Sequence, residues 1–142
     1  MKYDGKFFHV NQLGVVSDKE YGMKHSKFAR LHVKTARYDE GFYIYRTNAQ
    51  GLREENVIRE KAENEYRILV LGDSHVDGNC KVNDTFPNVS ESILNRQHDD
   101  SPYNVINSGT LSWSIRQMYL FLKQNSDIIK PDMALLTFYT GN

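Results

Sequence analysis

The 142-residue sequence contains a single cysteine, Cys80, and only three prolines. One cysteine cannot form an intrachain disulfide, so Cys80 is expected to be an incidental loop thiol and the redox compartment stays open. His9, His25 and His32 show no metal-like spacing to a cysteine or to a tight acidic cluster. These histidines are therefore expected to be ordinary surface or half-buried residues, and no metal site is predicted.

The sequence also lacks an excess of either charge and a long apolar run. Lys and Arg total 18, as do Asp and Glu, so nothing points to nucleic acid or to an anionic membrane. No apolar run is long enough to span a bilayer, and residues 1–30 lack the apolar core of a signal peptide. Localisation and membrane association stay unknown on these grounds, with a lean to the cytoplasm.

What the sequence does contain is an apolar strand followed at once by a serine. Residues 68–71 are Ile-Leu-Val-Leu, a run typical of a strand buried on both faces of a parallel sheet. Gly72 breaks this run, and Asp73 and Ser74 then occupy positions where a helix or turn begins. Helix N–H groups can stabilise negative charge there, so Ser74 is a candidate nucleophile. The alternative is a plain serine at the start of a helix.

Further strands and helices are predicted on both sides of this stretch. Aromatic and β-branched residues at 41–46 predict a strand, whereas the charged residues 54–65 predict a linker or a short surface helix. Residues 103–107 and 133–139 predict two more strands. Two apolar stripes predict helices between the strands: Phe86, Val89, Ile93 and Leu94, then Ile115, Met118, Tyr119 and Leu122. Alternating strands and helices indicate a parallel sheet with helices on both faces.

This pattern divides the chain into an N-terminal extension with β segments and a linker, residues 1–65, and an α/β core, residues 66–142. The three core strands are followed by three polar loops, Gly72-Asp73-Ser74, Asn107-Ser108-Gly109 and Thr140-Gly141-Asn142. Parallel neighbouring strands would bring these loops to one edge of the sheet. A hydroxyl, a bare backbone N–H and a side-chain amide would then face a common point, which suits acyl transfer.

In order along the chain, the three loops resemble blocks I, II and III of the SGNH (GDSL-type) hydrolases. The stretch Asn-Ala-Gln-Gly-Leu-Arg at 48–53 is similar to one that precedes block I in a bacterial branch of these enzymes. The resemblance covers roughly residues 40–142. It implies a three-layer α/β/α, flavodoxin-like fold with a parallel sheet, incomplete at the C-terminus and preceded by a partly β N-terminal segment. It implies no cofactor.

The resemblance also implies roles for individual residues. Ser74 would be the nucleophile, and its own N–H, the N–H of Gly109 and the side-chain amide of Asn142 would form the oxyanion hole. Gly72 and Asp73 would support the turn. The family's base and orienting acid come from a late Asp-x-x-His block, which is absent from this sequence. We therefore expect the chain to be the front part of a longer protein and to be inactive alone.

Two classes of function follow. The first is a serine ester hydrolase, or an acyl transferase of the same chemistry, acting on an acyl ester such as an O-acetylated sugar or a lipid. The second is a non-catalytic carbohydrate- or lipid-binding module with the same fold. An Asp-x-x-His downstream of Asn142 would favour the first class. His75 lies beside Ser74 in sequence, but the side chains of successive residues in such a turn diverge. Neither His75, His98 nor an N-terminal histidine is expected to replace the missing base.

Overall fold

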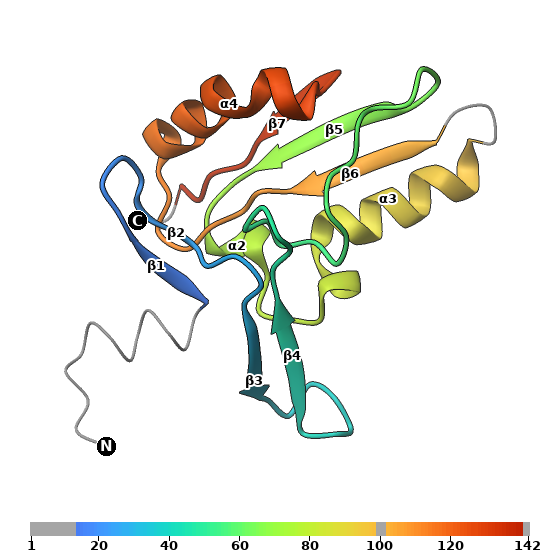
Figure 1. Ribbon diagram of the computed structural model, residues 1–142. Helices are drawn as coiled ribbons and strands as arrows, with labels where there is room; N and C mark the ends of the chain where they lie inside the picture. The colour runs from blue at the N-terminus through green and yellow to red at the C-terminus, as the bar shows by residue number, and fades with distance from the viewer. Residues whose placement is uncertain (1–13, 99–101, 141–142) are drawn as a thin grey trace.

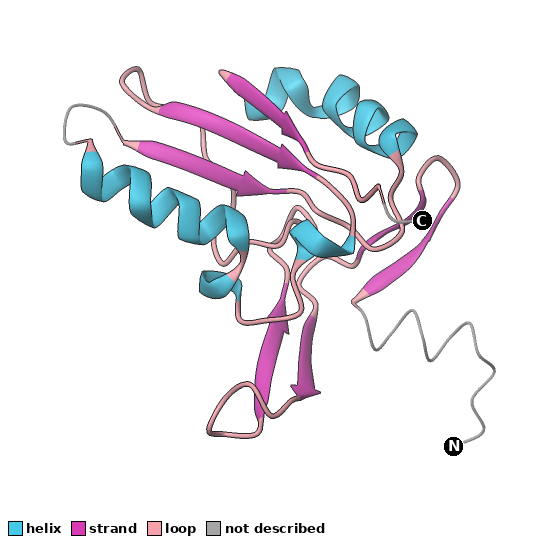
Figure 2. Ribbon diagram, turned by 180° about the vertical axis from the view of Figure 1, so that it is seen from behind, coloured by secondary structure: helices cyan, strands magenta, loops and turns pink. Residues whose placement is uncertain are grey.

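The computed structural model describes residues 14–98 and 102–140, and the chain is an α/β protein in which two small hairpins precede a parallel sheet (Figures 1 and 2). His9, Gly141 and Asn142 lie outside the described residues. The elements are, in chain order, strands β1 (Val15–Asp18), β2 (Gly22–His25), β3 (Arg30–Lys34), β4 (Phe42–Arg46) and β5 (Tyr66–Leu71), helix α2 (Ser74–Asp77), the 3₁₀ helix η1 (Val82–Asp84), helix α3 (Phe86–Gln97), strand β6 (Tyr103–Asn107), helix α4 (Ile115–Ile129) and strand β7 (Met133–Leu136).

The parallel sheet has three strands in the order β6-β5-β7, with Ile68 of β5 opposite Val105 on one side and Met133 on the other. The predicted parallel pairing is therefore confirmed, although β7 ends at Leu136 and is shorter than the predicted strand. β5 is the central strand. As in any strand, its side chains alternate between the two faces of the sheet, so every other one points to the same face. The carboxyl ends of all three strands lie at one edge, where the polar loops begin.

The two faces of the sheet contact different helices. Leu69 and Leu71 of β5 pack in one core cluster with Met118 and Ile129 of α4. Ile68, Val70 and Val105 pack in a second cluster with Val76 and Leu94, the latter from α3. In both views α4 lies against one face of the sheet and α3 against the other.

The predicted apolar stripe of α3 is mostly wrong. Phe86, Val89 and Ile93 are 49%, 42% and 41% exposed, and of the four predicted residues Leu94 alone packs against the core. The face turned to β6 instead carries polar residues, because this strand is at the edge of the sheet and its outward N–H groups need acceptors.

Side chains supply those acceptors along the whole outer edge of β6. The N–H groups of Tyr103, Val105 and Asn107 donate to Oδ1 of Asn95 (2.7 Å), Oε2 of Glu91 (2.7 Å) and Oε1 of Glu54 (2.6 Å). Each outward N–H in this series is thus occupied by a short polar side chain rather than by another strand. Such capping blocks the edge against pairing with a further β-strand.

The stripe predicted for α4 is correct in part. Met118 is buried and Leu122 packs against the core, whereas Ile115 and Tyr119 remain exposed. The helix is rotated toward the N-terminal extension, since Phe121 contacts the ring of Tyr21. The apolar surface of α4 therefore packs against both the sheet and the first hairpin.

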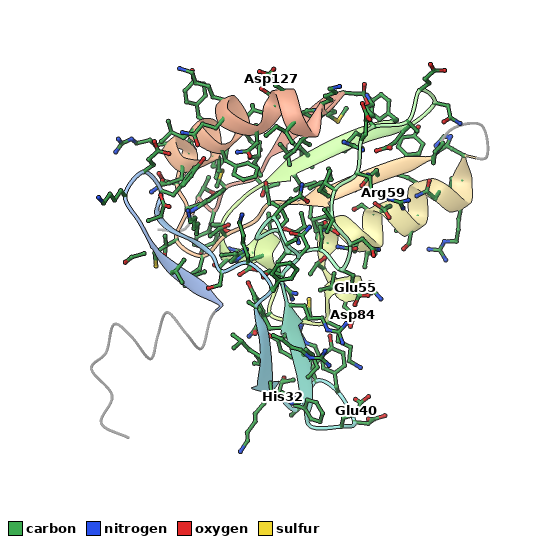
Figure 3. All side chains as sticks on the ribbon, viewed as in Figure 1. His32, Glu40, Glu55, Arg59, Asp84 and Asp127 are labelled. Atoms are coloured by element: carbon green, nitrogen blue, oxygen red, sulfur yellow. The ribbon has the colours of Figure 1, made fainter. Side chains whose placement is uncertain are left out.

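The N-terminal extension consists of two antiparallel hairpins, β1–β2 and β3–β4. Of their strands, only β4 was predicted. The first hairpin packs against the core: Tyr21 stacks on Trp113 with ring centroids 5.3 Å apart, and Nε1 of Trp113 donates to the carbonyl of Met23 (2.7 Å). Figure 3 shows His32 and Glu40 at the far end of the second hairpin.

Residues 54–65 contain neither helix nor strand and run back along the sheet to β5. In residues 14–98 and 102–140, no helix has the length and apolar character required to cross a bilayer.

β7 forms the opposite edge of the sheet and is much less protected than β6. Met133, Leu135 and Leu136 are between 38% and 47% exposed, and β7 has no strand on its outer side within the described chain. An exposed apolar edge of this kind favours association with another chain.

We expect the 142-residue chain to self-associate through β7, and Leu135→Lys to reduce that association because a charge on an edge strand opposes pairing. Sedimentation velocity over a range of protein concentrations would measure it. Val89→Lys on α3 is the matched control, since Val89 is equally exposed but distant from the edge. A chain that is monomeric at every concentration, or equal effects of both variants, would contradict this prediction.

Candidate active site

Ser74 is the first residue of α2 and its side chain is exposed. Asp73 caps the helix: its Oδ1 accepts the backbone N–H of His75 (2.9 Å), and its carbonyl accepts the N–H of Asp77 (3.0 Å). The carboxylate satisfies an N–H that the first helical turn leaves without a partner. The turn after β5 is therefore held by Asp73 and leaves the hydroxyl of Ser74 accessible.

The turn after β5 and the loop after β6 are each packed so closely against neighbouring atoms that both need a glycine. A side-chain carbon added at Gly109 would lie 2.3 Å from the backbone nitrogen of Asp77. One added at Gly72 would lie 2.2 Å from Cγ2 of Val76. Neither contact is sterically possible, because the nearest neighbours of Gly109 are backbone atoms and those of Gly72 are the β-branched side chains of Val76 and Thr137. Gly109 thus lets the loop after β6 rest directly on α2, and Gly72 lets Val76 and the loop after β7 pack against the turn after β5.

The loop after β7 reaches the same edge. The N–H of Thr137 donates to the carbonyl of Leu71 (2.9 Å), and the N–H of Thr110 donates to that of Gly72 (3.1 Å). The three loops are thus brought together at the carboxyl end of the sheet. The structure does not describe Asn142, so the side-chain amide assigned to the oxyanion hole by resemblance is not placed.

The backbone N–H of Gly109 already has a partner in this structure. It donates to Oδ1 of Asn107 (2.9 Å), whose Nδ2 in turn donates to the carbonyl of Val76 (2.9 Å). Asn107 is fully buried and thereby ties the loop after β6 to α2. An oxyanion at this point would have to share the Gly109 hydrogen with the Asn107 side chain.

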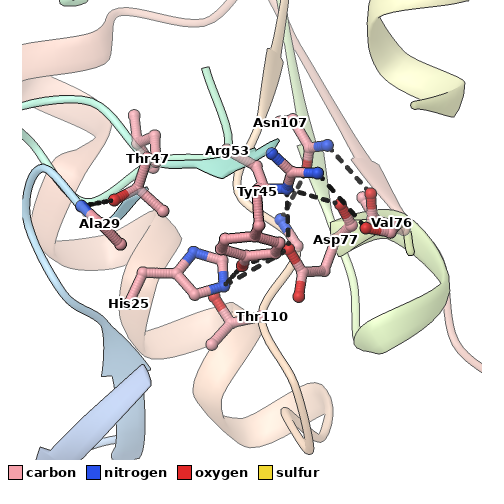
Figure 4. Close-up of polar contacts among 12 residues, drawn as sticks. His25, Ala29, Tyr45, Thr47, Arg53, Val76, Asp77, Asn107 and Thr110 are labelled. Atoms are coloured by element: carbon pink, nitrogen blue, oxygen red, sulfur yellow. Dashed lines mark hydrogen bonds and ion pairs between the residues drawn. The ribbon is translucent and has the colours of Figure 1, made fainter. Parts of the chain in front are cut away.

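A buried polar network lies next to the Ser74 turn (Figure 4). The hydroxyl of Tyr45 donates to Oδ1 of Asp77 (2.8 Å) and lies 2.9 Å from Nε2 of His25. His25 itself is 3.5 Å from the same carboxylate oxygen. Burial, with the adjacent Asp77 carboxylate as a further cause, raises the pKa of the Tyr45 phenol well above its usual range. His25 is 4% exposed, so the expectation that it is a surface or half-buried residue is wrong.

Arg53 is the most connected member of this network. It is fully buried, its Nε lies 3.3 Å from Oδ1 of Asp77, and its guanidinium lies 4.0 Å from the centre of the Tyr45 ring. Its nitrogens also donate to four backbone carbonyls, those of Arg46, Asp77, Gly78 and Cys80. One side chain thus joins the end of β4 to the segment that follows the candidate nucleophile.

The described histidines take four different environments. Nδ1 of His75 lies 3.0 Å from Oδ1 of Asp73, and the His75 ring stacks on Tyr139. His32 and His98 pack against other aromatic rings, away from the Ser74 turn. Among the described residues, no histidine is hydrogen-bonded to the Ser74 hydroxyl.

A cavity of about 400 Å³ opens beside Ser74. Its walls come from α2, the second hairpin and the loop after β6, and they include Val33, Tyr43, Tyr45, Asp77 and Leu111. A larger and more polar cavity of about 510 Å³ lies between the linker 54–65 and the β6–α3 edge, and none of the predicted site residues lines it. The chemistry predicted from the sequence therefore belongs to the smaller cavity.

Within residues 14–98 and 102–140, no cluster of three or more potential ligands could hold a metal ion. Cys80 is a free, buried cysteine, and burial raises the pKa of its thiol, as expected of an inert loop residue. Comparisons with protein-family models, curated proteins and solved structures gave no match. The site is thus defined by its residues and their geometry.

Arg53→Met is expected to lower the free energy of unfolding by about 3–5 kcal/mol, since it leaves a buried carboxylate without its cationic partner and several carbonyls without their donor. Urea unfolding followed by fluorescence measures the change. Arg46→Met is the control: this side chain is half-exposed and pairs with exposed Glu55, so its loss should cost no more than about 1 kcal/mol. Similar losses in the two variants would contradict the role assigned to Arg53.

A second expectation concerns pH. Burial raises the pKa of Glu54 to about 8, although its carboxyl accepts the N–H of Asn107. The folded state then holds a proton that the unfolded state has lost, so unfolding free energy should fall as pH rises from about 4.5 to about 8. Glu54→Gln should flatten this slope, measured by urea unfolding across that range. Glu55→Gln, at the exposed neighbouring position, should leave it unchanged; an equal effect would refute the assignment.

Proposed function

We propose that this chain carries the nucleophile of an SGNH-type serine ester hydrolase, or of an acyl transferase with the same chemistry. The observation that carries the proposal is the exposed Ser74 just after the central strand, in a turn that the loops of both neighbouring strands contact. The proposal includes the flavodoxin-like three-layer arrangement, which the packing of α3 and α4 against opposite faces supports.

In this mechanism, Oγ of Ser74 attacks the ester carbonyl carbon and the carbonyl oxygen takes the electron pair. The N–H groups of Ser74 and Gly109, with the amide of Asn142, stabilise the oxyanion. The alcohol then leaves with a proton, and water or an acceptor hydroxyl releases the acyl group from Ser74. No metal or organic cofactor takes part.

The attack by Ser74 requires a base that accepts its proton, and the described residues do not supply one. The sequence contains no Asp-x-x-His, and no described histidine bonds to Ser74. A serine without a base stays a weak nucleophile. We therefore expect Ser74 of residues 1–142 to be acylated slowly, and a base supplied in solution to raise the rate of acylation.

The second candidate is a non-catalytic carbohydrate- or lipid-binding module. The occupied N–H of Gly109 favours it, because this group would be free in a site preorganised for an oxyanion. Such a module would bind ligands in the cavity beside Ser74 without forming a covalent adduct.

Covalent labelling separates the two candidates. A fluorophosphonate should label Ser74, faster when imidazole is added as an external base, and intact-mass spectrometry should show one adduct. Ser74→Ala should abolish labelling, whereas Ser114→Ala should not, since Ser114 is an exposed serine that only caps α4. Labelling that persists in Ser74→Ala, or none even with imidazole, would favour the binding module.

A further inference from the structure

We infer that the cavity beside Ser74 binds an uncharged, apolar group of the substrate, and that Val33 and Tyr43 of the β3–β4 hairpin determine its size. The inference rests on the proposed function only in calling the bound molecule an ester. The N-terminal hairpin then supplies part of the substrate site, although it lies outside the stretch that carries the nucleophile.

Strand geometry explains why these two residues face Ser74. Val33 and Tyr43 are cross-strand partners in the hairpin, so their side chains lie on the same face. His32 and Phe42 occupy the adjacent positions, lie on the opposite face and contact each other there. Alternation along the strands therefore separates a cavity face from an outer face, and the two faces can be tested independently.

Contacts with the segment after α2 and with η1 fix the hairpin in this position. The hydroxyl of Tyr43 donates to Oδ1 of Asn79, which follows α2, and the hydroxyl of Tyr38 in the hairpin turn donates to Oδ2 of Asp84. The wall formed by Val33 and Tyr43 is thus preorganised, which lowers the entropy cost of binding.

The lining favours an uncharged ligand. Val33, Leu111 and the Tyr43 ring are apolar, and the hydroxyls of Tyr43 and Tyr45 are already donated to Asn79 and Asp77. No lysine or arginine lines this cavity in the described chain, whereas the Asp77 carboxylate does. A bound anion would lose its hydration without gaining a cationic partner, which is costly.

The volume favours a group of several carbons. At about 400 Å³ the cavity falls within the range of about 300–1,000 Å³ typical of small-molecule sites. An acetyl group would leave most of it empty. Each methylene buried against apolar walls should strengthen binding by roughly fourfold until the cavity is full.

The first experiment measures binding without chemistry, in Ser74→Ala. The probes are 2-butanone, 2-octanone and octanoate, and the readout is NMR of the methyl groups of Val33 and Leu111. We expect 2-octanone to bind at least about tenfold more tightly than 2-butanone and than octanoate. Equal affinity for the two ketones, or tighter binding of the anion, would overturn the inference.

The second experiment changes the hairpin. Val33→Trp should weaken 2-octanone binding at least about tenfold by filling the cavity, with less than about threefold effect on 2-butanone. His32→Trp adds the same bulk on the outer face and should change neither. Leu111→Ala removes an apolar wall from a different element and should also weaken 2-octanone. If Val33→Trp fails to fold, Leu111→Ala decides, and unchanged binding there refutes the inference.

Either part of an ester, the acyl chain or the alcohol, could supply the uncharged apolar group that the cavity binds. Fluorophosphonates with an octyl group on phosphorus or an octyloxy group mimic the two, and Val33→Trp should slow labelling by the one whose chain occupies the cavity. Labelling by both probes that Val33→Trp leaves unchanged would overturn the inference. Ketone binding in the absence of any labelling would instead uphold the cavity and refute the proposed hydrolase.

Discussion

A single buried guanidinium, that of Arg53, is the interaction on which the candidate site depends. Four backbone carbonyls and the Asp77 carboxylate converge on it, and the ring of Tyr45 covers it. Carbonyls in a buried loop must find donors, and the segment after α2 has too little regular structure to provide them itself. Arg53, which directly precedes the linker, supplies these donors. The shape of the nucleophile turn is therefore set from outside the strand–turn–helix unit that contains Ser74.

The sequence predicted the core of the fold better than its surroundings, for physical reasons. β5 was clear because Ile68–Leu71 is buried on both faces, which produces a continuous apolar run. β1 and β2 have only four residues each, too few for a periodic pattern to show. β3 does alternate, with Leu31 and Val33 between charged or polar neighbours, and this alternation is a sequence signal for a half-buried strand. The prediction for α3 was mostly wrong because the side of this helix that faces the sheet carries polar residues, which accept the outward N–H groups of β6.

The residues of the candidate site also fall into a group that the sequence predicted and a group that it did not. Ser74, Gly72 and Gly109 were predictable since each follows a strand, and parallel strands bring their ends together. His25, Tyr45 and Arg53 were not, because their common partner Asp77 lies between 24 and 52 positions further along the chain. No local pattern encodes such a contact. Only the short stretch at 48–53 pointed toward Arg53, and it did so through resemblance rather than through the physics of the residues.

The contact between the first hairpin and the core has a consequence for the order in which the chain can fold. Met23 and Trp113 are 90 positions apart, and an isolated two-stranded hairpin is marginally stable in water. A ribosome adding about 5–20 residues per second needs roughly 5–20 s to make the intervening chain. During that interval the aromatic face of Tyr21 has no partner. Among the described elements the first hairpin is therefore synthesised first, yet it is among the last to be stabilised.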